Sequence, residues 1–212
     1  MYLSVSSILI FVDYLVDEVI DVSKKMRSTR VEPIRNLDVV SRIKRDLQGN
    51  SRNYCLFVVG INTGLRASEL LNLKISDVIG SRDDGTINVW QKKSSKYRRV
   101  TINDVCSNAM ERYLQDRKGA TLDELFFVGQ RGGLTSSYLT RLIKRWCSKA
   151  GAPPLNYGSH TLRKTWGYHQ RVTFNADIPT IMVAYGHVSQ QQTLAYLGVQ
   201  ASEVASLYKN SL

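Results

Sequence analysis

Hydrophobic and polar residues follow one another along the chain with a period that predicts helices over most of its length. Apolar residues recur at three- and four-residue spacing, and glycines, prolines and capping residues separate one such stretch from the next. We expect helices at Val39–Leu47, Cys55–Asn62, Ala67–Leu73, Asp104–Lys118, Ser136–Lys149, His160–Val172, Ile178–Tyr185, Gln191–Leu197 and Ser202–Tyr208.

Two short segments have a different pattern. Thr86–Trp90 and Arg98–Ile102 are rich in β-branched and apolar residues, and a polar Lys-Ser-Ser-Lys stretch lies between them. This arrangement predicts a strand, a turn and a second strand. No other part of the chain carries a comparable strand pattern. The expected fold class is therefore mainly α with one small antiparallel β-sheet, an α+β domain.

The first 34 residues differ from the rest. Asp13, Asp17 and Asp21 lie four residues apart on one face of a predicted amphipathic helix within residues 1–23, and apolar residues cover much of the opposite face. This acidic helix either packs against its own domain or docks on a partner or a second subunit. Residues 24–34 are basic and poor in apolar side chains, which is typical of a linker. Residues 35–212 form the predicted main domain.

Charge narrows the class of partner. The 212 residues carry a formal net charge of +11, with 29 Lys and Arg against 18 Asp and Glu. Residues 1–23 hold four acidic and no basic side chains, so the remaining chain carries +15. Such an excess favours a polyanionic partner, with nucleic acid ahead of a membrane surface. The alternative is a charge that serves solubility alone.

Several classes of protein are excluded by features that the sequence lacks. The apolar run Ile8–Val12 is far shorter than the roughly 18 residues of a membrane-spanning helix. No basic residue precedes Lys24, as a secretory signal would require, so we expect a cytoplasmic protein. The cysteines and histidines, three of each, are too scattered for a metal site, and neither glycine-rich nucleotide motif occurs. We therefore expect no metal and no cofactor.

A set of polar residues lies in an order that points to a particular chemistry. The segment GLRASEL at residues 64–70 places an arginine at a helix start, and HTLR at residues 160–163 puts two cationic side chains on one helical face. His187 follows a glycine and precedes Tyr196 by nine positions, and the hairpin turn carries Lys92, Lys93 and Lys96. This order and spacing resembles the tyrosine recombinase family, the phage integrase type of site-specific DNA recombinase.

The resemblance implies six catalytic residues and one supporting residue. Two guanidiniums would hold the phosphate as it gains charge. One imidazole would take the proton of a tyrosine nucleophile, whose ordinary pKa is about 10, and a second would donate a hydrogen bond to a phosphate oxygen. A hairpin lysine would protonate the departing 5′ hydroxyl. The two guanidiniums are those of Arg66 and Arg163. His160 is the imidazole that would take the proton of Tyr196, and His187 is the second imidazole. The lysine is Lys93, or Lys92 if the register shifts by one residue, and Glu69 would orient Arg66.

Other basic residues are candidates for contact with DNA. Arg141, Lys144 and Arg145 recur at helical spacing, where they would bind phosphates without reading the sequence. The alternative for this stripe is a solvated helix face. The remaining candidates are Lys92, Lys96 and Lys164.

The function that the resemblance implies is site-specific recombination of double-stranded DNA, in integration, excision or inversion. Strands would be cleaved and rejoined through a 3′-phosphotyrosyl bond, without ATP or metal. We also expect a homo-tetramer on paired sites with exchange of the C-terminal helix, and absence of the family's usual N-terminal core-binding domain. Two alternatives stay open: a type IB topoisomerase-like activity with the same chemistry, and a catalytically weak fragment that only binds DNA.

Overall fold

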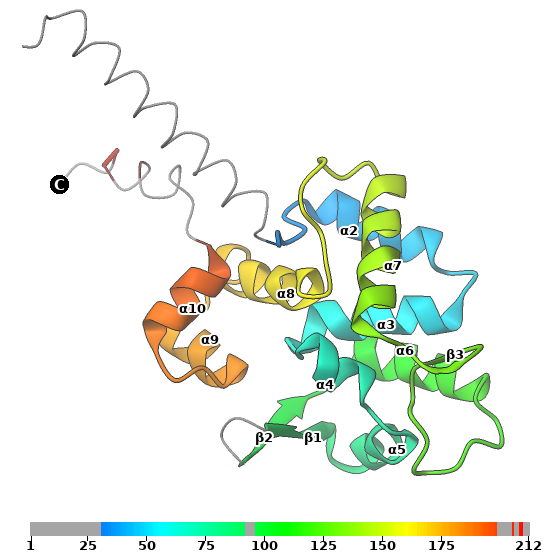
Figure 1. Cartoon of the computed structure of the whole chain (residues 1–212). Coiled ribbons are helices and arrows are strands. Elements are labelled where there is room, and N and C mark those ends of the chain that lie inside the picture. Colours follow the sequence, from blue (N-terminus) through cyan, green and yellow to red (C-terminus); the bar gives the residue numbers. More distant parts are fainter. Residues whose placement is uncertain (1–30, 92–95, 199–204, 206–207, 210–212) are drawn as a thin grey trace, which may run out of the picture. The chain divides into compact units, whose positions relative to one another are not determined.

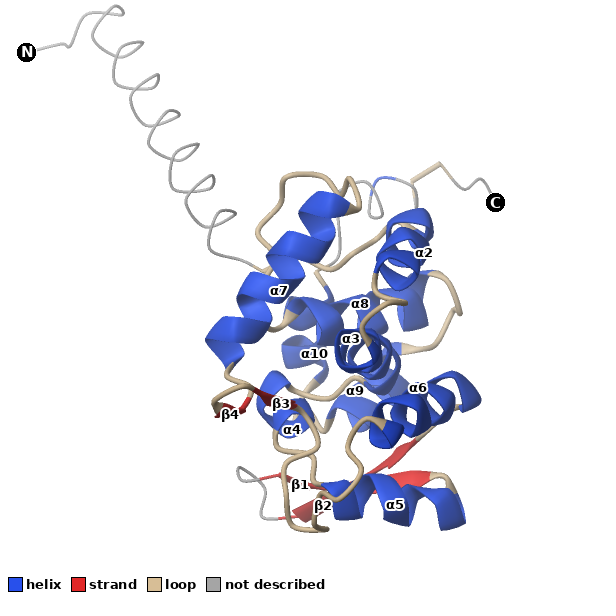
Figure 2. Ribbon diagram, turned by 90° about the vertical axis from the view of Figure 1, so that its right-hand side faces the viewer, coloured by secondary structure: helices blue, strands red, loops and turns tan. Residues whose placement is uncertain are grey.

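The computed structural model describes residues 31–91, 96–198, 205 and 208–209. Helices dominate this part of the chain, and the predicted fold class, mainly α with small antiparallel β-structure, is confirmed (Figures 1 and 2). The helices are α2 (Leu37–Asp46), α3 (Ser51–Thr63), α4 (Ala67–Leu71), α5 (Ile75–Asp84), α6 (Asp104–Gln115), α7 (Ser136–Lys149), α8 (Thr161–Val172), α9 (Ile178–Tyr185) and α10 (Gln190–Leu197). The strands are β1 (Thr86–Gln91), β2 (Lys96–Thr101), β3 (Val128–Gly129) and β4 (Gly132–Gly133).

Side-chain caps explain where many of these helices begin. The residues before α3, α6, α7, α9 and α10 each accept a hydrogen bond from the backbone N–H three positions later. Such a bond satisfies one of the backbone donors that the first turn leaves unpaired. These caps are Asn50, Asn103, Thr135, Asp177 and Ser189. Because Asn50 is a cap, α3 begins at Ser51, four residues before the predicted start.

The main core surrounds α3, which runs through the middle of the domain (Figures 1 and 2). This helix packs against α6 and α8, while α2 contacts both α3 and α7. The five residues from Cys55 to Val59 have no exposed surface. Consecutive residues of this stretch point to all sides of α3 and all are buried, which is typical of a central helix. Because α8 packs against α3, the active-site candidates on α8 are attached to the central helix of the core.

A second, smaller apolar cluster joins the last three described helices. Ile181, Tyr185 and Leu197 are almost completely buried, and Trp166 packs against them. The helices α8, α9 and α10 contact one another and lie together on one side of the domain (Figure 1). This cluster holds α10, which carries Tyr196, beside α8.

The strands β1 and β2 form the predicted antiparallel hairpin, in a register that pairs Thr86 with Thr101 at its base. Ile87 and Val89 lie on the buried face of this hairpin. On the opposite face Trp90 and Tyr97 are 48% and 69% exposed, with their rings edge to face at 4.9 Å. The hairpin therefore has one face in the core and one aromatic face in solvent.

Two elements of the structure are not among those predicted from the sequence. Helix α5 follows Lys74, which is not a typical cap, and it buries only Ile75 and Val78, so its apolar pattern is weak. The pair β3–β4 has two residues in each strand, too few for an alternating pattern. The expectation of a single sheet is thus wrong. The predicted bounds also run too long at α6, which ends at Gln115.

Some predictions concern residues outside the described part of the chain: the acidic helix within residues 1–23, the first part of the basic linker, Lys92, Lys93, and most of the helix Ser202–Tyr208. Residues 32–34, assigned to the linker, are hydrogen-bonded to the domain. Glu32 N donates to the Asn156 carbonyl at 2.8 Å, and Ile34 N donates to Thr165 Oγ1 at 2.9 Å. Among the described helices, none has the length and apolar character to cross a membrane.

Gly64, the residue after α3, has a backbone conformation and close neighbours that both favour glycine over any residue with a Cβ. Gly64 has φ 61°, and a Cβ at this position would lie 2.8 Å from the indole Cε3 of Trp166. We expect Gly64→Ala to lower the free energy of unfolding by about 2–4 kcal/mol, and hence the Tm by about 5–10 °C. Gly85→Ala is the matched control, because Gly85 has φ 65° with open space around it. Thermal unfolding of both variants checks this, and equal losses would contradict the packing argument.

Candidate active site

The structure brings together five of the six predicted catalytic residues. Arg66 and His160 precede the first residues of α4 and α8, and Arg163 follows one turn into α8. His187 lies in the short connection between α9 and α10, and Tyr196 lies near the end of α10. The sixth residue, Lys93, is outside the described part. All five described side chains come from one chain, so the site does not need a second copy to bring them together.

Arg163 is the centre of this site. Its side chain is almost completely buried, with 1% of the residue exposed. Nη1 donates to the Gly64 carbonyl at 2.5 Å, and Nη2 donates to the Tyr185 carbonyl at 2.9 Å. Burial is the main reason why the pKa of Arg163 falls to about 10, and the residue remains charged at neutral pH. A fixed positive charge is thus held at the ends of α3 and α9.

Tyr185 supports Arg163 in two ways. Its ring lies under the guanidinium, with 4.2 Å between the Arg163 Cζ and the ring centroid. Its hydroxyl donates to the backbone carbonyl of Arg163 at 2.8 Å. Tyr185 is fully buried. The residue directly before the Gly186-His187 pair is therefore a structural support for the buried arginine, a role that the sequence did not indicate.

Glu69 connects the second arginine to this centre. Its carboxylate accepts hydrogen bonds from the backbone N and Nη1 of Arg66, at 2.8 and 2.6 Å, and lies 4.0 Å from Nη1 of Arg163. Burial by itself raises the pKa of Glu69, but these hydrogen bonds and the neighbouring guanidiniums outweigh it, so the pKa is lowered. Glu69 is therefore a carboxylate at neutral pH, hydrogen-bonded to Arg66, the residue that it is predicted to orient.

The candidate nucleophile contacts the candidate base. Nδ1 of His160 and the hydroxyl of Tyr196 are 3.1 Å apart, which is hydrogen-bond distance. The Tyr196 ring centroid lies 5.5 Å from Cζ of Arg163 and 5.2 Å from Nζ of Lys164. Tyr196 thus has an imidazole nitrogen at hydrogen-bond distance from its hydroxyl and two cations near its ring.

His187 forms hydrogen bonds within the protein through both ring nitrogens. Nε2 lies 3.3 Å from Nη2 of Arg163, and Nδ1 lies 3.0 Å from Thr193 Oγ1. The Thr193 hydroxyl donates to the Ser189 carbonyl at 3.3 Å, so it accepts from His187. This pattern matches a neutral imidazole with its proton on Nδ1. In this arrangement His187 positions Arg163, and its predicted hydrogen bond to a phosphate would need a second ring proton.

Electrostatics keep both imidazoles neutral. Burial and then the charge of Arg163 lower the pKa of His160 below its usual value, and the same causes lower the pKa of His187 to about 4. Burial raises the pKa of Tyr196, and the charge of Arg163 acts against this. At neutral pH the site therefore pairs a protonated tyrosine with an unprotonated histidine, the states that proton transfer between them needs.

Arg98 is a further member of the site that is not among the predicted catalytic or supporting residues. This residue lies on β2, and its Nη2 donates to Glu69 Oε2 at 2.9 Å, with both side chains more than nine-tenths buried. A cleft of about 680 Å³ opens beside Arg66 and Glu69, and Trp90 and Tyr97 of the hairpin also line it. The hairpin is thus connected to the arginine pair. No single motif signals this contact, because Arg98 and Glu69 are 29 residues apart.

The predicted DNA-contacting residues have different surroundings. Arg141, Lys144 and Arg145 are exposed on one face of α7. Lys164 is 8% exposed and lies over the Tyr196 ring, so it belongs to the candidate active site and not to an outer basic surface. Lys96 begins β2, and its side chain, like the whole of Lys92, is outside the described part.

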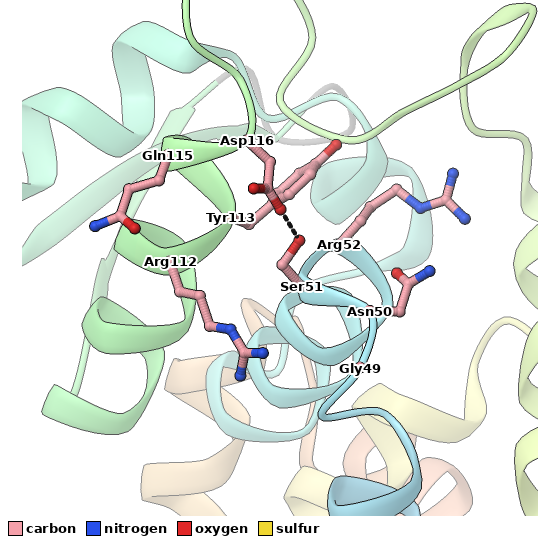
Figure 3. A pocket seen from close by; sticks show the side chains of 8 residues that line it. All are labelled: Gly49, Asn50, Ser51, Arg52, Arg112, Tyr113, Gln115 and Asp116. Carbon is pink, nitrogen blue, oxygen red and sulfur yellow. Dashed lines mark hydrogen bonds between the residues drawn. The ribbon is translucent and has the colours of Figure 1, made fainter.

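A second cavity, of about 600 Å³, lies away from these residues. It is formed where α3 begins and α6 ends, and Figure 3 shows its lining side chains, among them Arg52, Arg112 and Asp116. Asp116 accepts a hydrogen bond from Ser51 across this cavity (Figure 3). The active-site candidates lie at the other end of α3, which is about 20 Å long. No predicted site residue lines this cavity.

Comparison with known proteins shows the family. The phage integrase family matches residues 38–203. A probable integrase/recombinase of Bacillus subtilis, YoeC, is 31% identical over 186 residues, which cover 84% of this chain and 96% of YoeC. The chain belongs to the phage integrase family, whose members are tyrosine recombinases. Proteins of this family are enzymes of site-specific recombination.

Solved structures agree with the fold. The XerA recombinase superposes with a TM-score of 0.69 at 28% identity, covering 86% of this chain and 64% of XerA. The XerH site-specific recombinase superposes with a TM-score of 0.66 at 24% identity, which supports the fold alone. The chain spans 55% of XerH, so it corresponds to part of these larger recombinases.

Proposed function

We propose that this chain cleaves and rejoins DNA strands through Tyr196, as the catalytic part of a site-specific recombinase. The observation that carries the proposal is the 3.1 Å contact between the Tyr196 hydroxyl and His160 Nδ1, beside the buried guanidinium of Arg163. Family membership supports the reaction class. The individual residue roles rest on the geometry of the site.

In the proposed cleavage step, the Tyr196 oxygen attacks the phosphorus of one phosphodiester. A bond forms between this oxygen and phosphorus, the bond from phosphorus to the 5′ oxygen breaks, and the tyrosine proton passes to His160. A 3′-phosphotyrosyl bond and a free 5′ hydroxyl result. Rejoining reverses these steps with a 5′ hydroxyl as the nucleophile. Because one phosphodiester replaces another, the reaction needs no ATP.

Arg66 and Arg163 would stabilise the charge that collects on the non-bridging oxygens. Arg163 is preorganised by two backbone carbonyls and the Tyr185 ring, so little reorganisation accompanies the reaction. Arg66 is more accessible, with 35% of its side chain exposed, and opens toward the cleft beside the hairpin. By resemblance to the family, Lys93, between β1 and β2 in the sequence, would give a proton to the departing 5′ oxygen. The result is one cation fixed in the core and one positioned at the cleft for an arriving phosphate.

Double-stranded DNA is the proposed partner. The XerH structure is described as a post-cleavage complex with its palindromic difH substrate. The net charge of +11 and the exposed basic residues on α7 support the same partner here. On paired sites we propose a homo-tetramer in which C-terminal residues dock on a neighbouring copy. Light scattering of the protein with and without a two-site duplex tests the tetramer.

The reaction is tested with a pool of nicked duplexes of randomised sequence. A nick near the cleavage site lets the short 5′-hydroxyl strand diffuse away, so the phosphotyrosyl adduct accumulates and is recovered in denaturant. Wild-type protein should yield adducts enriched in one sequence. Relaxation of supercoiled plasmid without sequence preference would favour the topoisomerase alternative. Salt-dependent binding with no adduct from any duplex would favour a protein that only binds DNA.

The pH dependence of cleavage follows from His160. This residue accepts a proton only when it is neutral, and its pKa lies below the ordinary value of about 6.5. At subsaturating DNA the rate reports groups of the free enzyme. We expect the rate of adduct formation to stay above half its maximum as the pH falls to 6.5, and to decline at lower pH. Two results would contradict the role of His160 as the proton acceptor. One is loss of half the rate already above pH 6.5, and the other is an unchanged decline of the rate at low pH in His160→Gln.

A further inference from the structure

The side chain of Arg98 joins three segments of the domain. It extends from β2, and Nη2 donates to Glu69 Oε2 at 2.9 Å while Nη1 donates to the Ala184 carbonyl at 2.7 Å. The side chain is 9% exposed. Charged side chains buried to this degree are held by specific partners, because leaving them unpaired is costly. Arg98 therefore links the hairpin both to α4 and to the last turn of α9.

On the α4 side, Arg98 fixes the carboxylate that orients the catalytic arginines. Glu69 gives Oε1 to the guanidinium of Arg66, and Oε2 to the Arg66 backbone and to Arg98. The same Oε2 is 4.0 Å from Arg163. With Arg98 removed, one side-chain donor on Oε2 is lost, and the carboxylate is free to rotate toward the remaining cations. Arg66 would then lose the fixed geometry of its ion pair.

On the α9 side, Arg98 and Arg163 hold neighbouring carbonyls. Arg98 binds the carbonyl of Ala184, and Arg163 binds that of Tyr185, the next residue. The chain then turns at Gly186, which has φ 64°, and presents His187 to Arg163 at 3.3 Å. Two guanidiniums from different elements thus fix the last turn of α9, and with it the position of His187.

We propose that Arg98 is a positioning residue for strand cleavage, which couples the β1–β2 hairpin to the Arg66–Glu69 pair and to His187. This inference rests on the proposed function. Because Arg98 lies on β2, contact of the hairpin with DNA would be transmitted to the phosphate-binding groups through its side chain.

The test compares Arg98→Gln with Arg99→Gln. Arg99 is the next residue on β2, but it points to the opposite, exposed face, where it pairs with Asp84 at 2.6 Å. Both variants lose the same charge from the same strand. On the nicked duplex recovered with wild-type protein, we expect Arg98→Gln to form adduct about 10–100-fold more slowly at saturating DNA, with a Kd within threefold of wild type. Arg99→Gln should react like wild type, and Arg98→Lys should recover part of the rate.

Histidine NMR gives a readout that does not depend on cleavage. The chain has only three histidines, so labelled imidazole signals can be assigned with single His→Gln variants. Burial and the charges of Arg163 and Arg66 are the larger causes of the lowered pKa of His187, and the charge of Arg98 adds to them, so removal of Arg98 should raise this pKa. The titration in Arg99→Gln should not change. An unaltered His187 titration in folded Arg98→Gln overturns the inference, as does a rate loss explained by Kd alone. Absence of adduct with wild type would instead overturn the proposed function.

Discussion

Tyr196→Phe is expected to abolish formation of the covalent DNA adduct. The substitution removes the oxygen that would attack phosphorus and keeps the ring that packs near Arg163 and His187. Loss of a nucleophile typically costs at least about 10⁴-fold in rate. Folding should be nearly unaffected, because the lost hydrogen bond to His160 is worth about 1 kcal/mol. The measurement is the yield of adduct from the nicked duplex, together with DNA affinity.

The matched control for this variant is Tyr168→Phe. Tyr168 lies on α8 and contacts His169 and Arg35, away from Tyr196. It should form adduct at the wild-type rate. If Tyr196→Phe still formed more than about 1% of the wild-type amount of adduct, well above the activity that remains when a nucleophile is lost, Tyr196 would not be the nucleophile. Equal losses in both variants would point to a general effect of tyrosine removal on stability.

Arg163→Lys should produce the second large effect. Lysine keeps the positive charge but lacks the planar guanidinium, which donates to the carbonyls of Gly64 and Tyr185 at the same time. We expect the cleavage rate to fall by about 10²–10³-fold, the usual cost of losing one preorganised donor to the reacting phosphate. Adduct formation at saturating DNA is the measurement, because it separates the chemical step from binding.

Stability must be measured beside this rate. Arg163→Ala would leave two buried carbonyls without donors and is expected to lose about 3–5 kcal/mol of unfolding free energy. Arg163→Lys should lose less, since its ammonium can satisfy one carbonyl. A folded Arg163→Lys that cleaves within threefold of wild type would show that the bidentate guanidinium is not needed.

Much of the fold was predictable from local patterns. Helices with a clear cap and an apolar face, such as α7 and α9, have the predicted bounds. The predictions were less accurate where local signals are weak. Helix α5 lacks a typical cap and buries only Ile75 and Val78. Its first turn is held by hydrogen bonds from Ile75 N to the Glu124 carbonyl and from Ser76 N to the Leu122 carbonyl, which no local window contains.

The candidate site was predictable as a set of residues but not as a geometry. The order of motifs gave Arg66, His160, Arg163, His187 and Tyr196, and these five side chains do meet. Apart from Glu69, their supports could not be predicted, because these supports depend on contacts between residues far apart in the chain. Examples are the Arg98–Glu69 ion pair, across 29 residues, and the burial of Lys164 over Tyr196.

The most direct test is to locate the DNA on the protein. After trapping and nuclease digestion, trypsin should release residues 172–209 as one peptide, which contains Tyr185, Tyr196 and Tyr208. Fragmentation in a mass spectrometer then places the nucleotide remnant on one of them. We predict that the remnant is attached to Tyr196. Attachment to Tyr185, Tyr208 or any residue outside this peptide would contradict the proposed mechanism.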